Sequence, residues 1–367
     1  MAQWLKTTIW SFLSLLALII IVIIIFLIHA QVNDFKPKQT ELISEPKDSL
    51  SHELANRSFS LLSWNIGYAG LGQDMDFFYD EGDRVRPELK EFKRYSKSIY
   101  EQLASFSAID FILLQEVDVH SRRSYYNNES RHVSEILPRH HDNFAVNYKV
   151  PFVPMPLFNP LGKVHSGIQT LSKDKPYIVE RNYYPSSYSW PYRLFMLDRV
   201  YLKTVYKIET GHNLVVYNTH NSAFDDGELR DIEFRTIKND MLNEYLRGNY
   251  VIAGGDWNQN PPAFSNNYDP HNYNLSVIEP RLKNNAFPAA WKWAYEKGIP
   301  TNRSNDKPYV KGENSTTIID FFIISPNLKV DTVITKNLNF TSSDHNPVFL
   351  RVSIPDSISD TLPSIPE

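Results

Sequence analysis

The hydrophobic pattern of the chain begins with one long apolar segment. Residues 9–28 read IWSFLSLLALIIIVIIIFLI and carry no charge. As a helix rising about 1.5 Å per residue, this segment would extend about 30 Å, the thickness of the hydrocarbon core of a bilayer. We therefore expect residues 1–30 to form an N-terminal transmembrane anchor. A cleaved signal peptide is the alternative, but it would have a shorter apolar region, and Ile28 and His29 fit poorly before a cleavage site at Ala30.

Beyond residue 58, short apolar runs alternate with longer amphipathic stretches. Helical spacing predicts one helix within residues 88–106 and a second at about 228–246. In the first, Leu89, Phe92, Ile99 and Leu103 lie on one stripe. Short apolar runs predict strands at 59–65, 110–117, 213–220, 250–256, 318–325 and 347–354. Many strands with few helices between them predict an α+β fold with one large mixed sheet or two packed sheets.

Shifts in composition mark the ends of this domain. Residues 31–57 are polar and contain Pro37 and Pro46, which predicts a flexible linker before a folded domain at 58–355. Residues 356–367 are rich in Ser and Pro, which predicts a disordered tail. The chain is therefore expected to consist of an anchor, a linker, one folded domain and a tail.

Polar residues follow strand after strand of the predicted fold. A single polar residue at a strand end usually marks only the start of a loop. Here five strand ends carry residues able to bind metal or phosphate, and side chains on the ends of adjacent rigid strands can converge on one point. These residues are Asn65, Glu116, Asn218, His220, Asp256, Asn258, Asp344 and His345.

Oxygen donors predominate among these residues. Glu116, with Asp344 and Asn65, offers the ligands that suit Mg²⁺ or Mn²⁺, ions that retain water and bind substrate phosphate. The chain has no cysteine, which excludes disulfides, thiolate zinc sites and cysteine nucleophiles. A zinc site is the alternative, but its candidate ligands lack the spacing of zinc motifs. Those candidates are His220, His345 and Asp256.

The stretch GGDWN, residues 254–258, suggests how water could be activated. Asp256 can accept a proton from water or hold the water for attack, and Asn258 would point to the same side of an extended strand. We expect the two glycines to bring the backbone close to a phosphate.

Asp320 is the other unusual carboxylate, because it lies within the apolar run TTIIDFFIIS. A buried carboxylate without a partner is costly, so a partner is expected. A backbone amide or an arginine would suffice. The more specific hypothesis is that Asp320 bonds to the ring of His345 and keeps that ring oriented or cationic.

Overall charge does not indicate a nucleic-acid partner. The formal net charge is −4, so the composition does not guarantee a strongly basic face on the protein. One segment, residues 119–141, does contain Arg122, Arg123, Arg131 and Arg139. These residues could bind phosphate groups, or they could form a solvated helix with ion pairs to Glu129 and Glu135. The sequence leaves both possibilities open.

Taken in order along the chain, these motifs resemble those of the endonuclease/exonuclease/phosphatase superfamily. The ordered set covers residues 59–353 and is far more specific than any one of its members. It comprises SWN, LLQEVD, HSGIQTLSK, VVYNTHNSAF, GGDWN, IIDFFIIS and SSDHNP. The resemblance implies a four-layer α/β sandwich of two packed mixed sheets with helices outside, preceded here by the N-terminal transmembrane helix. It also implies divalent-metal-dependent hydrolysis of a phosphate ester.

The same resemblance implies a role for each residue. Asn65 and Glu116 look like the metal-binding pair, and Asp344 is similar to a second metal or phosphate residue. Asp256 and Asn258 look like the pair that activates water and orients phosphate. His220 resembles the residue near the scissile phosphate or the leaving oxygen. Asp320 and His345 look like the pair that stabilises charge in the transition state.

Substrate choice stays open at this stage, because it depends on loops rather than on the fold. We expect a nuclease or phosphodiesterase, with a phosphomonoesterase or a lipid-headgroup phosphodiesterase as the alternative. A binding module without activity is disfavoured, because each motif position holds a competent residue. The expected protein is a single-pass membrane monomer, with no protein partner and with its catalytic domain outside the cytoplasm.

Overall fold

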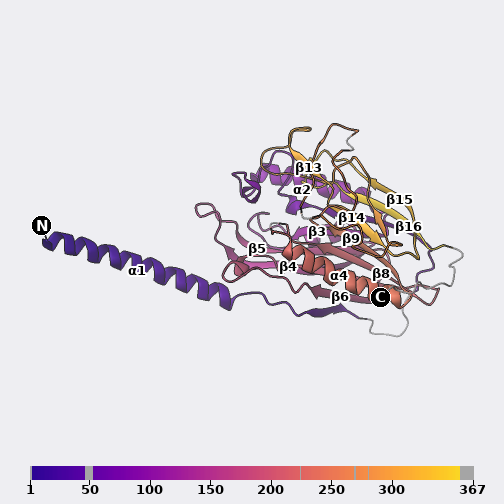
Figure 1. Ribbon diagram of the computed structural model, residues 1–367, viewed down its shortest axis with the longest axis horizontal. Coiled ribbons are helices and arrows are strands. Elements are labelled where there is room, and N and C mark those ends of the chain that lie inside the picture. Colours follow the sequence, from indigo (N-terminus) through magenta and orange to yellow (C-terminus); the bar gives the residue numbers. More distant parts are fainter. Residues whose placement is uncertain (1, 46–52, 224, 268–269, 280, 356–367) are drawn as a thin grey trace.

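The computed structural model describes residues 2–45, 53–223, 225–267, 270–279 and 281–355. The tail predicted at 356–367 lies outside the described residues. The first helix, α1 (Ala2–Val32), projects away from the rest of the chain as a single rod (Figure 1). Most of its apolar side chains are exposed, and its length and composition suit a membrane span or a signal sequence.

Two mixed sheets form the centre of the domain. The larger has the order β1-β6-β7-β8-β9-β14-β11, and the smaller has the order β15-β16-β2-β3-β5-β4. The strands of the larger sheet are β1 (Thr40–Ser44), β6 (Ile178–Tyr183), β7 (Val200–Lys207), β8 (Asn213–His220), β9 (Tyr250–Asp256), β14 (Asp320–Ile324) and β11 (Lys292–Ala294). Those of the smaller are β15 (Lys329–Thr335), β16 (Val348–Ser353), β2 (Ser58–Asn65), β3 (Phe111–Asp118), β5 (Gly162–Ser172) and β4 (His141–Val153).

Helices cover the outer faces of the two sheets. Apolar residues of both sheets, such as Leu113, Val216 and Leu350, pack together in one core cluster. Helix α4 (Glu228–Leu246) packs through Phe234 and Ile237 on the larger sheet. Helices α2 (Leu89–Ser105) and α3 (Glu129–Ile136) pack on the smaller one. This order of helix, sheet, sheet and helix confirms the predicted four-layer sandwich.

Short elements complete the chain. The 3₁₀ turns are η1 (Gly67–Ala69), η2 (Phe78–Asp80) and η3 (Tyr192–Phe195). A small third sheet has the order β10-β13-β12 and consists of β10 (Asn274–Leu275), β13 (Ser315–Thr317) and β12 (Asn302–Arg303). This sheet lies near the catalytic candidates, because Asn302 forms an isolated bridge with His345.

The α2 stripe differs from its prediction at one residue. Phe92, Ile99 and Leu103 are buried as expected, but Leu89 is exposed, because it is the first residue of the helix. A capping box fixes that start: Glu88 caps the backbone of Glu91, and the Glu91 side chain accepts from the backbone N–H of Glu88.

Part of the predicted linker is ordered against the domain. Strand β1 pairs antiparallel with β6 at the edge of the larger sheet, and Arg181 forms an ion pair of 3.0 Å with Glu41. Leu54 is buried in the core between the sheets. A flexible linker is therefore the wrong description for these residues. The pairing depends on backbone hydrogen bonds to a distant strand, which a polar local pattern does not reveal. The boundaries at residues 30, 57 and 355 stay predictions.

Candidate active site

Strand register brings three of the predicted residues into one row. In the parallel pair β8–β9, His220 lies opposite Asp256. In the antiparallel pair β9–β14, Asp256 lies opposite Asp320. Asp320 therefore begins its strand, whereas the sequence had suggested a position in the middle of one. All three side chains are almost fully buried.

The two glycines before Asp256 serve this close strand packing. A Cβ on Gly254 would lie 2.4 Å from the Phe322 ring, and one on Gly255, whose φ is +150°, would lie 2.0 Å from the carbonyl oxygen of Thr219. These contacts explain the two glycines by strand packing, and the expectation that they bring the backbone close to a phosphate stays a prediction. Their small size lets β9 pack between its neighbours.

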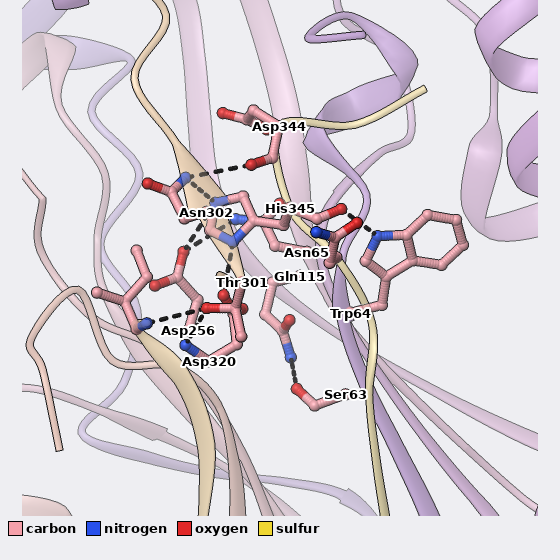
Figure 2. Close-up of polar contacts among 12 residues, drawn as sticks. Ser63, Trp64, Asn65, Gln115, Asp256, Thr301, Asn302, Asp320, Asp344 and His345 are labelled. Atoms are coloured by element: carbon pink, nitrogen blue, oxygen red, sulfur yellow. Dashed lines mark hydrogen bonds and ion pairs between the residues drawn. The ribbon is translucent and has the colours of Figure 1, made fainter. Parts of the chain in front are cut away.

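Asp320 and His345 form the predicted pair. The Oδ2 atom of Asp320 lies 2.8 Å from Nδ1 of His345 (Figure 2). The indole N–H of Trp64 donates to the carbonyl oxygen of His345 at 3.0 Å, which ties the segment before β16 to β2. The side chains of Asp320 and His345 are at most 5% exposed, so the pair lies in a medium of low polarity. The hypothesis of an Asp320–His345 hydrogen bond is confirmed by this geometry.

The charge of His345 follows from its surroundings. Burial alone would lower the pKa of the imidazole, but Asp320 and Asp256 outweigh it and raise the pKa to about 10. The other ring nitrogen, Nε2, lies 3.7 Å from Oδ2 of Asp256 and 2.9 Å from Nδ2 of Asn302. The Asn302 nitrogen suits a neutral ring, so a cationic ring requires this amide to turn its oxygen toward Nε2.

Asn65 joins carboxylates from the two sheets. Its Nδ2 donates to Oδ2 of Asp256 at 3.0 Å and to Oε1 of Glu116 at 3.2 Å. Its Oδ1 accepts from the backbone N–H of Gly67. In this conformation Asn65 positions the two carboxylates, and binding a metal through Oδ1 would require the amide to turn.

Glu116 reaches the site because its strand is irregular there. The pairing of β3 with β5 shifts register between Leu114 and Val117, and Glu116 has a φ of +54°. Such a bulge redirects a side chain beside the regular ladder. The Glu116 side chain is 22% exposed, and its Oε1 atom lies 3.8 Å from Nε2 of His220.

Burial also sets the protonation of the neighbouring groups. Burial raises the pKa of Asp256 to about 7 and raises the pKa of Glu116. Burial, reinforced by the nearby cations Arg199 and His345, lowers the pKa of His220 well below its usual range. His220 is therefore a neutral imidazole whose Nε2 atom lies 3.6 Å from Oδ2 of Asp256.

Asn258 reaches the site by a route that the sequence does not indicate. It has a φ of +50°, so the chain turns immediately after β9 and is not extended. Its Nδ2 donates to the carbonyl oxygen of Asn221 at 2.8 Å, and its backbone N–H donates to Oδ1 of Asp256. The expected shared direction of an extended D-x-N pair was wrong, yet the turn still places Asn258 beside Asp256.

These residues surround one cavity of about 540 Å³. We call the set His220, Asp256, Asp320 and His345 the cavity floor. Of the eight residues to which the family resemblance gives a role, six line the cavity, namely Glu116, His220, Asp256, Asn258, Asp344 and His345. The other two, Asn65 and Asp320, are fully buried and bonded to lining residues. The structure thus brings these eight residues together, while their roles stay predictions. Asn218, the remaining strand-end candidate, does not line the cavity: its buried amide accepts from Gln115 and donates to the carbonyl oxygen of Gln169.

The cavity wall includes one arginine from residues 119–141, the segment that could either bind phosphate or form a solvated helix. Arg123 is buried, lines the cavity and makes two hydrogen bonds to Asp118, at 2.9 and 3.1 Å. Its guanidinium lies 3.6 Å from the centre of the Tyr68 ring. By contrast, Arg131 forms an exposed ion pair with Glu135 on α3. The ion-pair interpretation therefore holds for Arg131, whereas phosphate binding by Arg123 stays a prediction.

Residues that sequence reasoning missed come from the loops around the cavity. The Asn305 amide donates to Oδ2 of Asp344 at 2.8 Å, and Asn302 contacts His345. Arg199 lines the wall and donates to the carbonyl oxygen of His220. None of these residues lies in a motif with distinctive spacing, so only their three-dimensional placement identifies them.

The donor set fits a divalent cation bound by oxygen. Glu116, Asp256 and Asp344 face one cavity, and burial raises the pKa of the first two. A bound Mg²⁺ or Mn²⁺ would offset this concentrated negative charge. Ligand atoms of Asp256, Asp320 and His345 also lie within 4.8 Å of one another, the spacing of a metal group. Because Asp320 already bonds to Nδ1 of His345, we favour a metal position on the Glu116 side of the cavity.

Comparison with known proteins agrees with this architecture. Residues 62–345 match the Endonuclease/Exonuclease/phosphatase family. The structure resembles an endonuclease/exonuclease/phosphatase from Beutenbergia cavernae DSM 12333, with a TM-score of 0.54 and 16% identity, covering 82% of this chain and 72% of that one. A family protein from Leptotrichia buccalis C-1013-b gives a TM-score of 0.52 and 16% identity, with 81% and 100% covered.

A third similar structure is ANGEL2, described as a 2',3'-cyclic phosphatase in complex with adenosine-2',3'-vanadate. It gives a TM-score of 0.53 and 17% identity, covering 87% of this chain and 99% of that one. A comparison with curated proteins found no match. Identities this low establish a shared fold and not a shared substrate. The family match, however, extends over most of the sequence, and the chain belongs to the endonuclease/exonuclease/phosphatase family.

Proposed function

We propose that this protein is a membrane-tethered, divalent-metal-dependent hydrolase of phosphate esters, in which water attacks phosphorus in line. The observation that carries the proposal is the buried Asp256 beside the Asp320–His345 pair, at 3.7 Å from Nε2 of His345. An acid–base carboxylate and a cationic donor on the floor of one cavity are the parts that phosphoryl transfer to water requires.

Glu116 and Asp344 would hold the Mg²⁺ or Mn²⁺, with Asn65 as a further ligand if its amide turns. When bound, the ion supplies charge neutralisation at the phosphate oxygens. The remaining chemistry belongs to the side chains of the cavity. A module that binds without reacting would have no need of an Asp–His pair buried at this cost.

Asp256 is the proposed acceptor of the proton from the attacking water. Its pKa of about 7 lies near neutral pH, where a group can accept a proton efficiently. Asn258, fixed by its bond to the carbonyl oxygen of Asn221, would orient that water or the phosphate. His220, a neutral imidazole, would hydrogen-bond the leaving oxygen.

His345 would donate from Nε2 to the phosphoryl oxygens as negative charge develops on them. Asp320 holds the ring in place and favours its cationic form. Arg123 supplies a second fixed positive charge on the wall, because its two bonds to Asp118 leave it little freedom to move.

A phosphodiester is the preferred substrate class, which includes nucleic acids. The formal net charge of −4 provides no general attraction for a long polyanion. A phosphomonoester or a lipid headgroup is therefore the second candidate.

We further propose that α1 anchors a monomeric protein with a single pass and that the domain lies outside the cytoplasm. Lys6 on one side and Lys36 with Lys38 on the other do not decide this orientation by charge. Protease added to intact cells or spheroplasts should degrade the domain. Protection of the domain until lysis would reverse the orientation.

A substrate panel tests the proposed activity. The full-length protein in detergent with Mg²⁺ should hydrolyse at least one of a soluble aryl phosphodiester, plasmid DNA, single-stranded DNA, RNA, phospholipids or inositol phosphates. EDTA should abolish the activity, and added Mg²⁺ or Mn²⁺ should restore it. Full activity in EDTA, or no hydrolysis of any substrate by metal-loaded protein, would reject the proposal.

A further inference from the structure

Exposed apolar side chains gather on two loops beside the cavity. We call this set the apolar rim. The end of β4 and the connection between β4 and β5 carry most of it, and the segment at Trp190 adds the rest. Phe158 is 97% exposed, Leu157 is 72% exposed and Trp190 is 58% exposed. The full rim consists of Phe152, Met155, Leu157, Phe158, Trp190 and Tyr192. Clustered large apolar groups of this kind mark an interaction surface.

The rim adjoins the helix that is long enough to span a membrane. Phe26 of α1 stacks on Phe195, with ring centroids 5.6 Å apart and planes 2° apart. Phe26 also meets Phe152 edge-on, at 6.2 Å. Figure 1 shows the C-terminal end of α1 beside the strands β4 and β5. An ion pair of 2.9 Å between Asp34 and Arg193 fastens the chain just after the helix.

These contacts fix the depth of the rim relative to a bilayer. Phe26 lies two residues before the end of the uncharged segment 9–28. If that segment fills the hydrocarbon core, Phe26 lies near its boundary, and so do the rings that touch it. Trp190 and Tyr192 are the residue types that favour the boundary between hydrocarbon and water. The rim is therefore continuous with the membrane contact of α1.

Positive charge accompanies the rim. Exposed Lys36, Lys149 and Lys163 line a shallow hollow between the end of α1 and the β4–β5 hairpin. Basic side chains next to an apolar surface suit lipid headgroups, because their charge faces the phosphates while the apolar groups enter the interface. A protein partner would have no need of a rim at the depth where α1 leaves the bilayer.

The same segments also form one wall of the cavity. Tyr148 of β4 and Leu161 at the end of the connecting loop line it, and so do Tyr188, Met196 and Leu197 on either side of Trp190. The cavity wall and the rim are therefore built from the same segments of the chain. A phosphoester that lies in the headgroup layer would be close to the floor without leaving the bilayer.

We infer that the apolar rim is a second membrane-contact surface, which seats the domain on the bilayer and presents the cavity to phosphoesters carried by membrane lipids. The substrate part of this inference rests on the proposed function. The seating part rests on the proposed anchoring by α1, on the contacts of Phe26 and on the exposure of the rim.

A label on the rim tests the seating directly. The chain has no cysteine, so Phe158→Cys provides a single site for a fluorophore in the full-length protein. The matched control is Ile334→Cys on β15, where the side chain is 50% exposed and lies far from α1 (Figure 1). The proteins are reconstituted in phosphatidylcholine and phosphatidylglycerol vesicles whose lipids carry a shallow nitroxide quencher.

The label at 158 should be quenched at least several-fold more than the label at 334. Equal quenching at the two positions, or no quenching at 158, would overturn the seating. This result does not depend on any enzyme activity.

A second experiment tests substrate access. The double variant Leu157→Ser with Phe158→Ser changes two exposed side chains that do not line the cavity. Hydrolysis of phospholipid in vesicles should fall about tenfold or more, while hydrolysis of a soluble aryl phosphodiester should stay within twofold. Ile334→Ser should change neither rate.

Two outcomes separate this inference from the proposed function. If wild-type protein hydrolyses the soluble diester but no vesicle phospholipid, the substrate inference fails and the proposed function stands. If it hydrolyses no substrate of the whole panel, the proposed function fails too, and the quenching experiment still decides the seating.

Discussion

The cavity floor and the apolar rim are built in opposite ways. The floor consists of buried polar groups at the ends of paired strands, where register fixes each neighbour: His220 beside Asp256, and Asp256 beside Asp320. The rim consists of exposed apolar groups on loops, and Phe158 has almost no contact with the domain. The comparison teaches that the residues proposed for chemistry lie on the rigid sheets, whereas those proposed for membrane contact lie in segments that can vary without disturbing the sheets.

The largest effect should follow from removing the proposed metal ligand. Glu116→Ala should lower the metal-dependent rate about 10³-fold, because charge neutralisation at the phosphate contributes several kcal/mol. Its partner Asn65 retains a bond to Asp256, so the melting temperature should change little. Glu135→Ala, which removes only an exposed ion pair with Arg131, is the matched control. A Glu116→Ala enzyme within tenfold of wild type would place the metal elsewhere in the cavity.

A smaller effect should follow at the cavity wall. Arg123→Lys keeps the charge but loses the paired bonds to Asp118 and the contact with the Tyr68 ring. We expect a loss of about 10- to 100-fold in kcat/KM, the range for charge-assisted hydrogen bonds. Arg131→Lys on α3 should retain full activity. Equal rates for the two variants would show that Arg123 only supports the fold.

The smallest effect concerns stability, near the contact between the domain and the segment after α1. Burial, with a contribution from Asp34, raises the pKa of the Asp198 carboxyl to about 7. The folded state therefore holds a proton that the unfolded state releases near pH 4, and stability falls as pH rises from about 4 to about 7. Asp198→Asn should remove this slope, worth about 2 kcal/mol after solvent screening.

Denaturant titration from pH 4 to pH 8 measures this slope in the wild type and in Asp198→Asn. The variant should gain most over the wild type at pH 8. The same difference between them at every pH would show that Asp198 titrates normally.

The floor could largely be predicted from the sequence, because short apolar runs ending in polar residues are a local signal. Glu116, Asp256 and His345 converge on the cavity, as their positions at strand ends suggest. The Asp320–His345 bond was predicted because Asp320 is a carboxylate within an apolar run. Two details could not be predicted. The positive φ of Asn258 accompanies a hydrogen bond to Asn221. The glycines before Asp256 are needed because Phe322 and Thr219 of neighbouring strands leave no room for a Cβ.

The structure of the linker and the role of the rim loops could not be predicted from the sequence for a related reason. Strand β1 is short and polar, and only its partner β6, more than a hundred residues away, makes it a strand. In the sequence, the rim residues look like ordinary apolar residues of loops. Only the contacts of Phe26 with Phe152 and Phe195 show that they adjoin α1. Contacts between distant segments carry this information, and a single sequence does not display them.

The measurement that tests the central claim most directly is a double-mutant cycle on Asp320 and His345, read as kcat on a soluble phosphodiester with saturating Mg²⁺. His345→Ala should lower kcat roughly 10²- to 10³-fold, the effect of removing a preorganised donor. Asp320→Asn should also lower kcat, and the double variant should lose less than the product of the two single losses, because the residues act as a unit. Strictly multiplicative losses, or a His345→Ala enzyme with nearly wild-type kcat, would contradict the account.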